Sequence, residues 1–222
     1  GIIGAFARYY FKSKTYLWVH DLWPESVKVA GNLNNKFLLK LINYMTMLIY
    51  RYNDVILVQS PLFKDYIIKQ GVKNEKIKFY PYYAEDFYKP LDLKEENIYP
   101  EGINIVFAGN IGVAQSFDTI ISAANKIRSI KEDINFIIMG EGRDKQRVME
   151  KISKMSLDNN FKFLGLFPPE KMSDYFACAD ALLVSLKKSK IFKLTIPGKL
   201  QSYLACGKPI IGSIDGICSD II

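Results

Sequence analysis

The chain has 222 residues and a formal net charge of +7, and 49% of its residues are hydrophobic. This length fits one large or two small domains, and the hydrophobic content supports folded cores, which excludes a disordered chain. The positive charge favours an anionic partner: a nucleotide, an anionic lipid surface or nucleic acid. Nucleic acid is the weakest of these, because the sequence contains no basic block, zinc finger or RNA-binding signature.

The chain opens with an apolar run, residues 1–7, which is followed by Arg8 and Lys12. The run is too short to span a membrane and lacks a cleavage-type site, so we interpret it as the end of a helix in the protein core. The chain starts at Gly1 and stops at Ile222 inside a further predicted element, so we expect it to be truncated at both ends.

Apolar runs of strand length then alternate with segments of helical periodicity. The predicted strands cover residues 15–20, 55–58, 77–80, 103–108, 134–139, 161–164, 181–185 and 209–212. The predicted helices cover residues 35–52, 61–70, 116–131, 143–155, 169–177 and 198–205. This alternation predicts an α/β fold with parallel sheets.

The predicted helix over residues 35–52 is apolar on nearly all sides, with a thin polar stripe that includes Lys36 and Lys40. Such a helix is buried or lies against something apolar. Burial between a sheet and a neighbouring helix is the simpler interpretation. Docking on an anionic membrane, with the lysines outward, is the alternative.

The periodicity stops around residues 86–102, in a charged stretch with two prolines that is typical of a linker. We therefore predict a partial amino-terminal domain over residues 1–88, a linker over residues 89–102 and a carboxyl-terminal domain over residues 103–222.

Glycine-rich turns follow two predicted strands of the second domain, at residues 109–112 (G-N-I-G) and 140–142 (G-E-G). Ligands of open α/β folds bind at the carboxyl ends of the strands, and such turns let a nucleotide approach the backbone. Glu141 could accept hydrogen bonds from a ribose or base, and a solvated charge is the alternative. Because the turns all follow strands of one domain, we expect them to converge on one cleft.

A third candidate segment for nucleotide binding covers residues 194–212, which read L-T-I-P-G-K-L-Q-S-Y-L-A-C-G-K-P-I-I-G. Pro197 suits the first turn of a helix, Gly198 leaves backbone amides approachable and Lys199 adds a mobile positive charge. A diphosphate could therefore bind there. An ordinary helix with a stop signal at Gly207 is the alternative.

Four motifs of the second half occur in a fixed order: F-A-G-N-I-G-V-A-Q-S, F-I-I-M-G-E-G, F-L-G-L-F-P-P-E and I-P-G-K-L-Q-S-Y-L-A-C-G-K-P. Together they resemble the carboxyl-terminal domain of glycosyltransferase family 4. In the first half, H-D-L-W-P-E-S-V and D-V-I-L-V-Q-S-P-L-F resemble the later amino-terminal domain of the same family, particularly members that build capsule and O-antigen polysaccharides. The resemblance implies the B-type fold of two Rossmann-like domains, here with an incomplete amino-terminal domain, and a retaining hexosyltransferase.

In this family the second domain mainly holds the nucleotide-sugar donor and the first holds the acceptor. The candidate donor-binding residues are Gly109, Asn110, Gly112, Gly140, Glu141, Gly142, Gly198, Lys199 and Ser202. The candidate catalytic residues are His20, the only histidine, and Asp21; in many relatives a histidine at a similar strand end lies against the donor sugar. From the residues alone, a structural hydrogen bond by His20 and helix capping by Asp21 are the alternatives.

The chain also departs from the family. Relatives usually carry two glutamates eight positions apart around the donor helix, where this chain has Leu194 and Ser202. We expect Ser202, Lys199 and backbone amides to replace the missing carboxylate. The glycine-rich acceptor loop of the family's amino terminus is absent as well, which leaves the activity of this fragment open.

The resemblance implies transfer of a sugar from a nucleotide-diphosphate donor to a lipid-linked glycan acceptor in cell-surface polysaccharide biosynthesis. We expect a cytoplasmic protein that docks peripherally on the inner face of the cell membrane, with reduced cysteines. No metal or other cofactor is predicted, because no ligand residues occur at metal-binding spacing. A sugar-nucleotide epimerase of the same architecture and a non-catalytic nucleotide-binding assembly partner are the alternatives.

Overall fold

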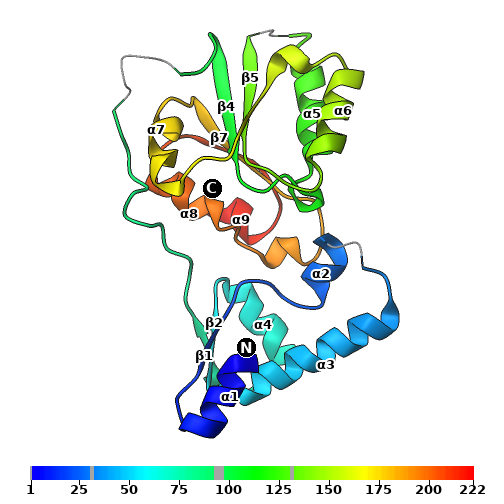
Figure 1. Ribbon diagram of the computed structural model, residues 1–222, viewed down its shortest axis with the longest axis vertical. Helices are drawn as coiled ribbons and strands as arrows, with labels where there is room; N and C mark the ends of the chain where they lie inside the picture. Colours follow the sequence, from blue (N-terminus) through cyan, green and yellow to red (C-terminus); the bar gives the residue numbers. More distant parts are fainter. Residues whose placement is uncertain (1, 31–32, 93–97, 131–132) are drawn as a thin grey trace. The chain divides into compact units, whose positions relative to one another are not determined.

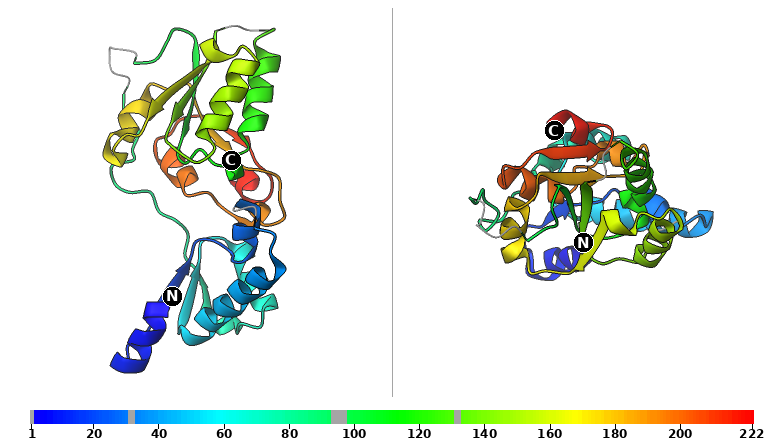
Figure 2. Two further views of the ribbon diagram at one scale, coloured as in Figure 1. Left: turned by 45° about the vertical axis from the view of Figure 1, so that its right-hand side comes forward. Right: turned by 90° about the horizontal axis from the view of Figure 1, so that it is seen from above.

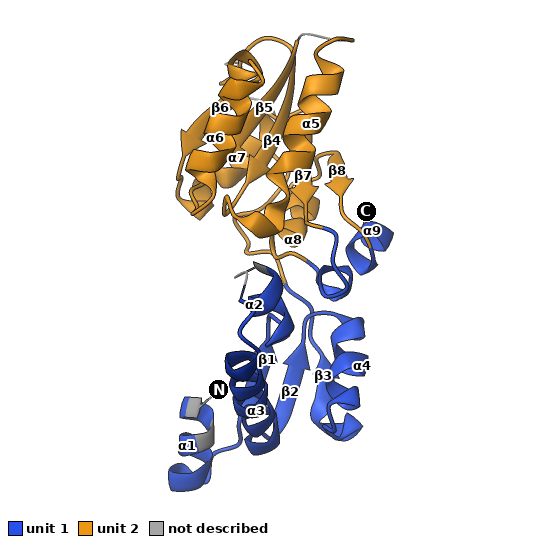
Figure 3. Cartoon of the chain, turned by 90° about the vertical axis from the view of Figure 1, so that its right-hand side faces the viewer, with its two compact units in different colours: residues 1–82, 188–196, 216–221 blue, residues 83–187, 197–215, 222 orange. Residues whose placement is uncertain are grey.

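The structure is a computed structural model that describes residues 2–30, 33–92, 98–130 and 133–222. The middle of the predicted linker, residues 93–97, and Lys131 at the end of a predicted helix lie outside the described residues. The chain divides into two compact units, which Figure 3 colours separately. Unit 1 consists of Gly1–Tyr82, Lys188–Ile196 and Gly216–Ile221, and unit 2 consists of Tyr83–Lys187, Pro197–Asp215 and Ile222.

Unit 1 is built on a three-stranded parallel sheet in the order β1-β2-β3. Its strands are β1 (Tyr16–Val19), β2 (Val55–Val58) and β3 (Ile77–Phe79). Its helices are α1 (Ile2–Phe11), α2 (Glu25–Ala30), α3 (Lys36–Tyr52), α4 (Pro61–Lys69), η1 (Asn74–Lys76), η5 (Phe192–Leu194) and α9 (Ile217–Ile221). The sequence sets helix starts, since the Asn35 side chain accepts hydrogen bonds from two amides of α3 and Ser60 caps α4.

Unit 2 contains a five-stranded parallel sheet in the order β6-β5-β4-β7-β8. Its strands are β4 (Ile103–Ala108), β5 (Ile134–Met139), β6 (Phe161–Gly165), β7 (Ala181–Ser185) and β8 (Ile210–Ser213). Its helices are η2 (Val113–Gln115), α5 (Phe117–Ile127), α6 (Lys145–Lys154), η3 (Asp158–Asn160), η4 (Pro169–Lys171), α7 (Met172–Ala177) and α8 (Lys199–Ala205). Figures 1 and 2 show α5 and α6 side by side on one face of this sheet and α7 and α8 on the other.

The strand order of unit 2 determines where a ligand can bind. From β4 the chain adds β5 and β6 on one side, and it then returns to add β7 and β8 on the other side. The order therefore reverses between β4 and β7, and open α/β sheets bind ligands outside the carboxyl ends of strands at such a reversal. A ligand site is therefore expected among the residues that follow β4, β5 and β7.

The predicted α/β fold with parallel sheets is confirmed, and every predicted strand forms with bounds that agree within two residues. The interpretation of residues 1–7 as part of a core helix is wrong. Residues 2–7 do belong to a helix, α1, but Ile3 is 85% exposed and Phe6 is 61% exposed, and Gly1 lies outside the described residues. Apolar composition shows that a helix tends to pack against another apolar surface, but it does not say which surface. The sequence therefore did not distinguish a helix buried in the core from one with an exposed apolar face.

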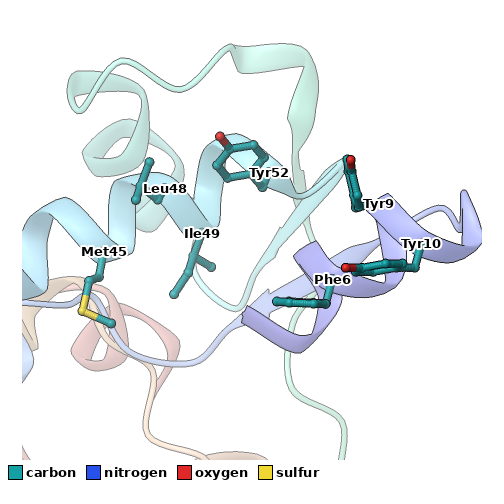
Figure 4. Close-up of a pocket in the computed structure, with 7 residues that line it drawn as sticks. All are labelled: Phe6, Tyr9, Tyr10, Met45, Leu48, Ile49 and Tyr52. Atoms are coloured by element: carbon teal, nitrogen blue, oxygen red, sulfur yellow. The ribbon is translucent and has the colours of Figure 1, made fainter.

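Helix α3 is also more exposed than expected, because burial between a sheet and a neighbouring helix was the simpler interpretation of its apolar sequence. Only Thr46 and Tyr50 are buried along this helix, whereas Phe37, Tyr44 and Tyr52 are exposed. Together, α1 and α3 line an apolar groove of about 490 Å³, to which Figure 4 shows side chains of both helices contributing. None of the helices described is both long and apolar enough to cross a bilayer.

Candidate functional site

The two predicted glycine turns of unit 2 lie directly against each other at the carboxyl ends of β4 and β5. The Gly109 amide donates to the Met139 carbonyl at 2.8 Å, and the Ile111 amide donates to the Glu141 carbonyl at 2.8 Å. Gly140 has a φ of +140°, and a Cβ added to it would lie 2.0 Å from the Gly109 carbonyl oxygen. Glycine is therefore required at position 140 by both conformation and space.

Lys199 places its amine next to the first of these turns. The Nζ atom lies 3.6 Å from the centroid of the Phe107 ring and 3.1 Å from the position that a Cβ on Gly109 would occupy. It is buried, and no other described residue forms a hydrogen bond with it. Burial lowers the pKa of Lys199 to about 7. A buried amine with no polar partner is unfavourable, and an anion bound at the turn would supply that partner.

Helix α8, seven residues long, is anchored by Tyr203. The Tyr203 side chain is 1% exposed, and its hydroxyl oxygen accepts a hydrogen bond from the Ala108 amide at 2.8 Å. Its ring also packs edge-on against Phe176 at 5.1 Å. Because Ala108 ends β4, this contact ties α8 to the strand that leads into Gly109 and so positions Lys199.

The other predicted residues of α8 contribute differently. Gly198 precedes the helix with a φ of −56°, and nothing lies within 4 Å of the position that a Cβ on it would occupy. Ser202 lies one turn after Lys199 and is hydrogen-bonded to Tyr88. Burial raises the pKa of Tyr88, and this bond partly offsets the increase. Leu194, which occupies a family acid position, lies in η5 of unit 1.

The remaining predicted donor residues form the rim of the turns. Asn110 and Glu141 are exposed, and Glu141 forms an ion pair with Lys145 at 2.5 Å. A Cβ on Gly112 would lie 2.9 Å from the Asn110 amide nitrogen, and one on Gly142 would lie 2.1 Å from a backbone oxygen. The structure thus brings the two glycine turns and Lys199 together, with Glu141 at the surface beside them.

Sequence reasoning missed two contributions to this end of the sheet. Ser185 ends β7, next to β4, and its buried hydroxyl has no hydrogen-bond partner among the described residues. Its position at a strand end was a signal that could have identified it. The hydrogen bond from the Ala108 amide to the Tyr203 hydroxyl joins residues that are 95 positions apart, and no local sequence pattern predicts it.

The candidate catalytic residues lie in unit 1, where the parallel strands end at one edge of the sheet. His20 follows β1 and Tyr82 follows β3, and the His20 Nδ1 atom is hydrogen-bonded to the Tyr82 hydroxyl. Trp18 packs against both rings, 4.5 Å from the imidazole centroid and 5.3 Å from the phenol centroid. Gln59 follows β2 and is fully buried, with no hydrogen-bond partner in the described part of the chain for either amide atom.

Asp21 is exposed beside this cluster. Burial, assisted by the negative charge of Asp21, raises the pKa of Tyr82 to about 12. The Tyr82 hydroxyl therefore stays protonated near neutral pH. Tyr82 was not predicted as a site residue, because it lies 62 residues from His20 and outside any strand or helix.

A family model described as "Glycosyl transferases group 1" matches residues 102–222, which is more than half of the chain and contains both glycine turns and Lys199. The chain belongs to the group 1 glycosyl transferases. In this family member the matched segment starts one residue before β4 and runs to the last residue of the chain.

Individual relatives agree with this family. The chain is 29% identical over 148 residues to WcaI of Escherichia coli K12, a glycosyl transferase assigned to colanic acid biosynthesis, and this match covers 63% of the chain and 35% of WcaI. It is 24% identical over 225 residues to WbjE of Pseudomonas aeruginosa, assigned as a glycosyltransferase, with 94% of the chain and 53% of WbjE covered. The chain thus spans about a third to a half of these relatives.

Among solved structures, HepE of Anabaena in complex with UDP-glucose matches with a TM-score of 0.74 at 16% identity. The match covers 100% of this chain and 59% of HepE. At that identity the likeness concerns the fold, and it identifies the α/β architecture of this group 1 glycosyl transferase as the B-type glycosyltransferase fold.

Proposed function

We propose that this group 1 glycosyl transferase moves a sugar, with retention of configuration, from a nucleotide-diphosphate-sugar donor to a lipid-linked glycan acceptor in the synthesis of capsule or O-antigen polysaccharide. The observation that carries the donor assignment is the Lys199 amine, which is buried against the Gly109 turn and has no hydrogen-bond partner in the part of the chain that the structure describes. The assignment of WcaI to colanic acid biosynthesis supports the polysaccharide role, and the UDP-glucose in HepE supports the donor class.

In the proposed reaction, Lys199 and the backbone amides of the two turns bind the donor diphosphate. The bond between the anomeric carbon and the diphosphate oxygen breaks, and negative charge develops on the leaving group. The anomeric carbon bonds to an acceptor hydroxyl oxygen, and the proton of that hydroxyl passes to the leaving diphosphate. A protonated Lys199 beside that group stabilises the charge, more strongly in a buried site than in water. His20 and Asp21 would contact the donor sugar at the end of β1, and no metal ion or cofactor is needed for these roles.

The test of this function is a transfer assay with labelled UDP-glucose as the first donor and membrane lipid extracts as the acceptor. We expect a glycolipid product that gains one sugar, with the anomeric configuration of the donor retained by NMR. Formation of an epimeric nucleotide sugar without transfer would establish the epimerase instead. Donor binding with neither hydrolysis nor transfer would establish a non-catalytic binding partner.

We further propose that α1 and α3 hold the protein on the inner face of the cell membrane, where lipid-linked acceptors would be found. Ile3, Phe11 and Phe37 are each exposed by more than three quarters. In sequence the two helices contain no aspartate or glutamate, while α3 begins with Lys36 and contains Lys40. Apolar side chains beside positive charges without acidic neighbours are complementary to an anionic bilayer.

Vesicle sedimentation tests this docking. We expect binding to phosphatidylcholine vesicles that contain phosphatidylglycerol and weaker binding to phosphatidylcholine alone. The double variant Phe11→Ser/Phe37→Ser should bind roughly tenfold more weakly, because it loses apolar area from the bilayer interface. Ile130→Ser is the matched control, since Ile130 is 86% exposed in unit 2. A dimer in light scattering with no vesicle binding would assign the same surface to a second copy of the chain.

A further inference from the structure

The ring cluster of His20, Trp18 and Tyr82 in unit 1 contains a hydrogen bond whose proton can be assigned to one of its two partners. The His20 Nδ1 atom and the Tyr82 hydroxyl are hydrogen-bonded, and a neutral imidazole carries its proton on one ring nitrogen only. If Nδ1 carries it, the phenol oxygen accepts and the other ring nitrogen has no proton to donate. If the phenol donates, Nδ1 accepts and the His20 proton is on Nε2.

The surroundings favour donation by the phenol. The Tyr82 hydroxyl keeps its proton near neutral pH, because burial and the charge of Asp21 raise its pKa to about 12. An imidazole nitrogen is also a better hydrogen-bond acceptor than a phenol oxygen. These two properties assign the shared proton to the Tyr82 hydroxyl, with the His20 Nδ1 atom as its acceptor.

The ring of His20 is also held in place. The Trp18 ring lies 4.5 Å from the imidazole centroid at 49° and contacts Tyr82 at 5.3 Å, and the Tyr82 and His20 centroids are 5.0 Å apart. Each of the three rings therefore touches the other two. His20 remains exposed to solvent while its Nδ1 edge is occupied, so a ligand reaches the ring through Nε2.

We propose that Tyr82 is a positioning residue that holds neutral His20 with its proton on Nε2, so that His20 acts toward a sugar hydroxyl as a hydrogen-bond donor through Nε2. The inference rests on the proposed function for the role of the sugar, but the protonation site is independent of it. Orientation by a fixed hydrogen-bond partner is the general way in which proteins select a histidine tautomer.

The experiment uses the fact that His20 is the only histidine of the 222-residue chain. In protein labelled with ¹⁵N-histidine, long-range ¹H–¹⁵N spectra at a pH where the ring is neutral report the protonated nitrogen without any need for assignment. We expect the proton on Nε2 in the wild type and a mixture of both tautomers in Tyr82→Phe. A proton on Nδ1 in the wild type, or an unchanged spectrum in Tyr82→Phe, would overturn the inference.

Tyr80→Phe is the matched control. Tyr80 follows the same strand and packs edge-on against Trp18 at 5.3 Å, so it reports general loosening of the ring cluster. In Tyr80→Phe we expect the His20 tautomer of the wild type, with the proton on Nε2. A change in the tautomer populations of His20 as large as that in Tyr82→Phe would assign the effect to ring packing and overturn the role of the Tyr82 hydroxyl.

A kinetic arm separates this inference from the proposed function. In the transfer assay, Tyr82→Phe should lower kcat roughly tenfold with the KM for the donor unchanged, and His20→Ala should lower kcat about a hundredfold. Loss of activity in His20→Ala but not in Tyr82→Phe would overturn the positioning role. Full activity in both variants, with the Nε2 proton confirmed by NMR, would instead overturn the proposed function of His20.

Discussion

Replacing Lys199 with methionine is expected to weaken binding of UDP-glucose at least about a hundredfold, while raising the free energy of unfolding by about 3 kcal/mol at pH 7. Donor binding is lost because the amine is the positive group against the Gly109 turn. Stability rises because the amine is buried without a hydrogen-bond partner among the described residues, and methionine fills a similar volume without a charge.

The pKa shift of Lys199 determines how stability and donor affinity change with pH. The pKa of Lys199 falls from 10.5 to about 7 on folding, because burial disfavours the charged form. Between these values the unfolded chain binds a proton that the folded chain does not bind, so the stability contribution rises with pH across that window. Affinity for the donor behaves oppositely: it is highest below about pH 7, where Lys199 is charged, and falls as the pH rises.

Calorimetric titration with UDP-glucose and urea unfolding, both at several pH values, measure the two effects. In Lys199→Met, the rise in stability between about pH 7 and pH 10.5 and the fall in donor affinity above about pH 7 should be lost. Lys171→Met is the control, because Lys171 is an exposed lysine of the same unit and should change neither quantity. Unchanged donor affinity in Lys199→Met would remove Lys199 from the phosphate site, whatever happened to the stability.

Replacing Gly140 with alanine is expected to destabilise the fold by about 3 kcal/mol or more and to abolish donor binding. The new Cβ would lie 2.0 Å from the Gly109 carbonyl oxygen, and neither backbone can retreat, since the Gly109 amide is bonded to Met139 and the Gly140 amide to Gly165. The turns at the ends of β4 and β5 must therefore separate.

Gly198→Ala is the matched control for this substitution. Gly198 already has a helical φ of −56°, with open space where the Cβ would lie, so alanine should leave the stability unchanged or raise it by up to about 1 kcal/mol. Thermal unfolding of both variants measures the difference. Equal effects of the two substitutions would show that backbone contact between the turns is not what requires glycine.

The sequence predicted features that depend on short-range patterns. Apolar runs identified the strands, and parallel strands deliver their carboxyl ends to one edge, so the meeting of the Gly109 and Gly140 turns followed from topology. The position of Lys199 beside Gly109 followed from the same rule, since α8 leads into β8 of that sheet.

Features that depend on long-range contacts were not predictable in this way. The Tyr82 hydroxyl meets His20 across 62 residues, and Tyr203 meets Ala108 across 95 residues. Tyr203 stands in the I-P-G-K-L-Q-S-Y motif, but neither that motif nor the sequence around Tyr82 identifies a partner so far along the chain. The exposure of α1 was missed for a related reason, since periodicity reveals an apolar face without identifying what covers it.

The division of the chain also has a practical consequence for dissecting it. Unit 2 is not one continuous stretch, because Lys188–Ile196 and Gly216–Ile221 belong to unit 1. No single cleavage of the backbone separates the units, and a polypeptide starting at Tyr83 would carry Ile191, Phe192 and Ile196, all buried in the whole chain, without the rest of unit 1. Isolating unit 2 would require a short polar bridge from Lys187 to Pro197 in place of Lys188–Ile196, and a chain that ends at Asp215.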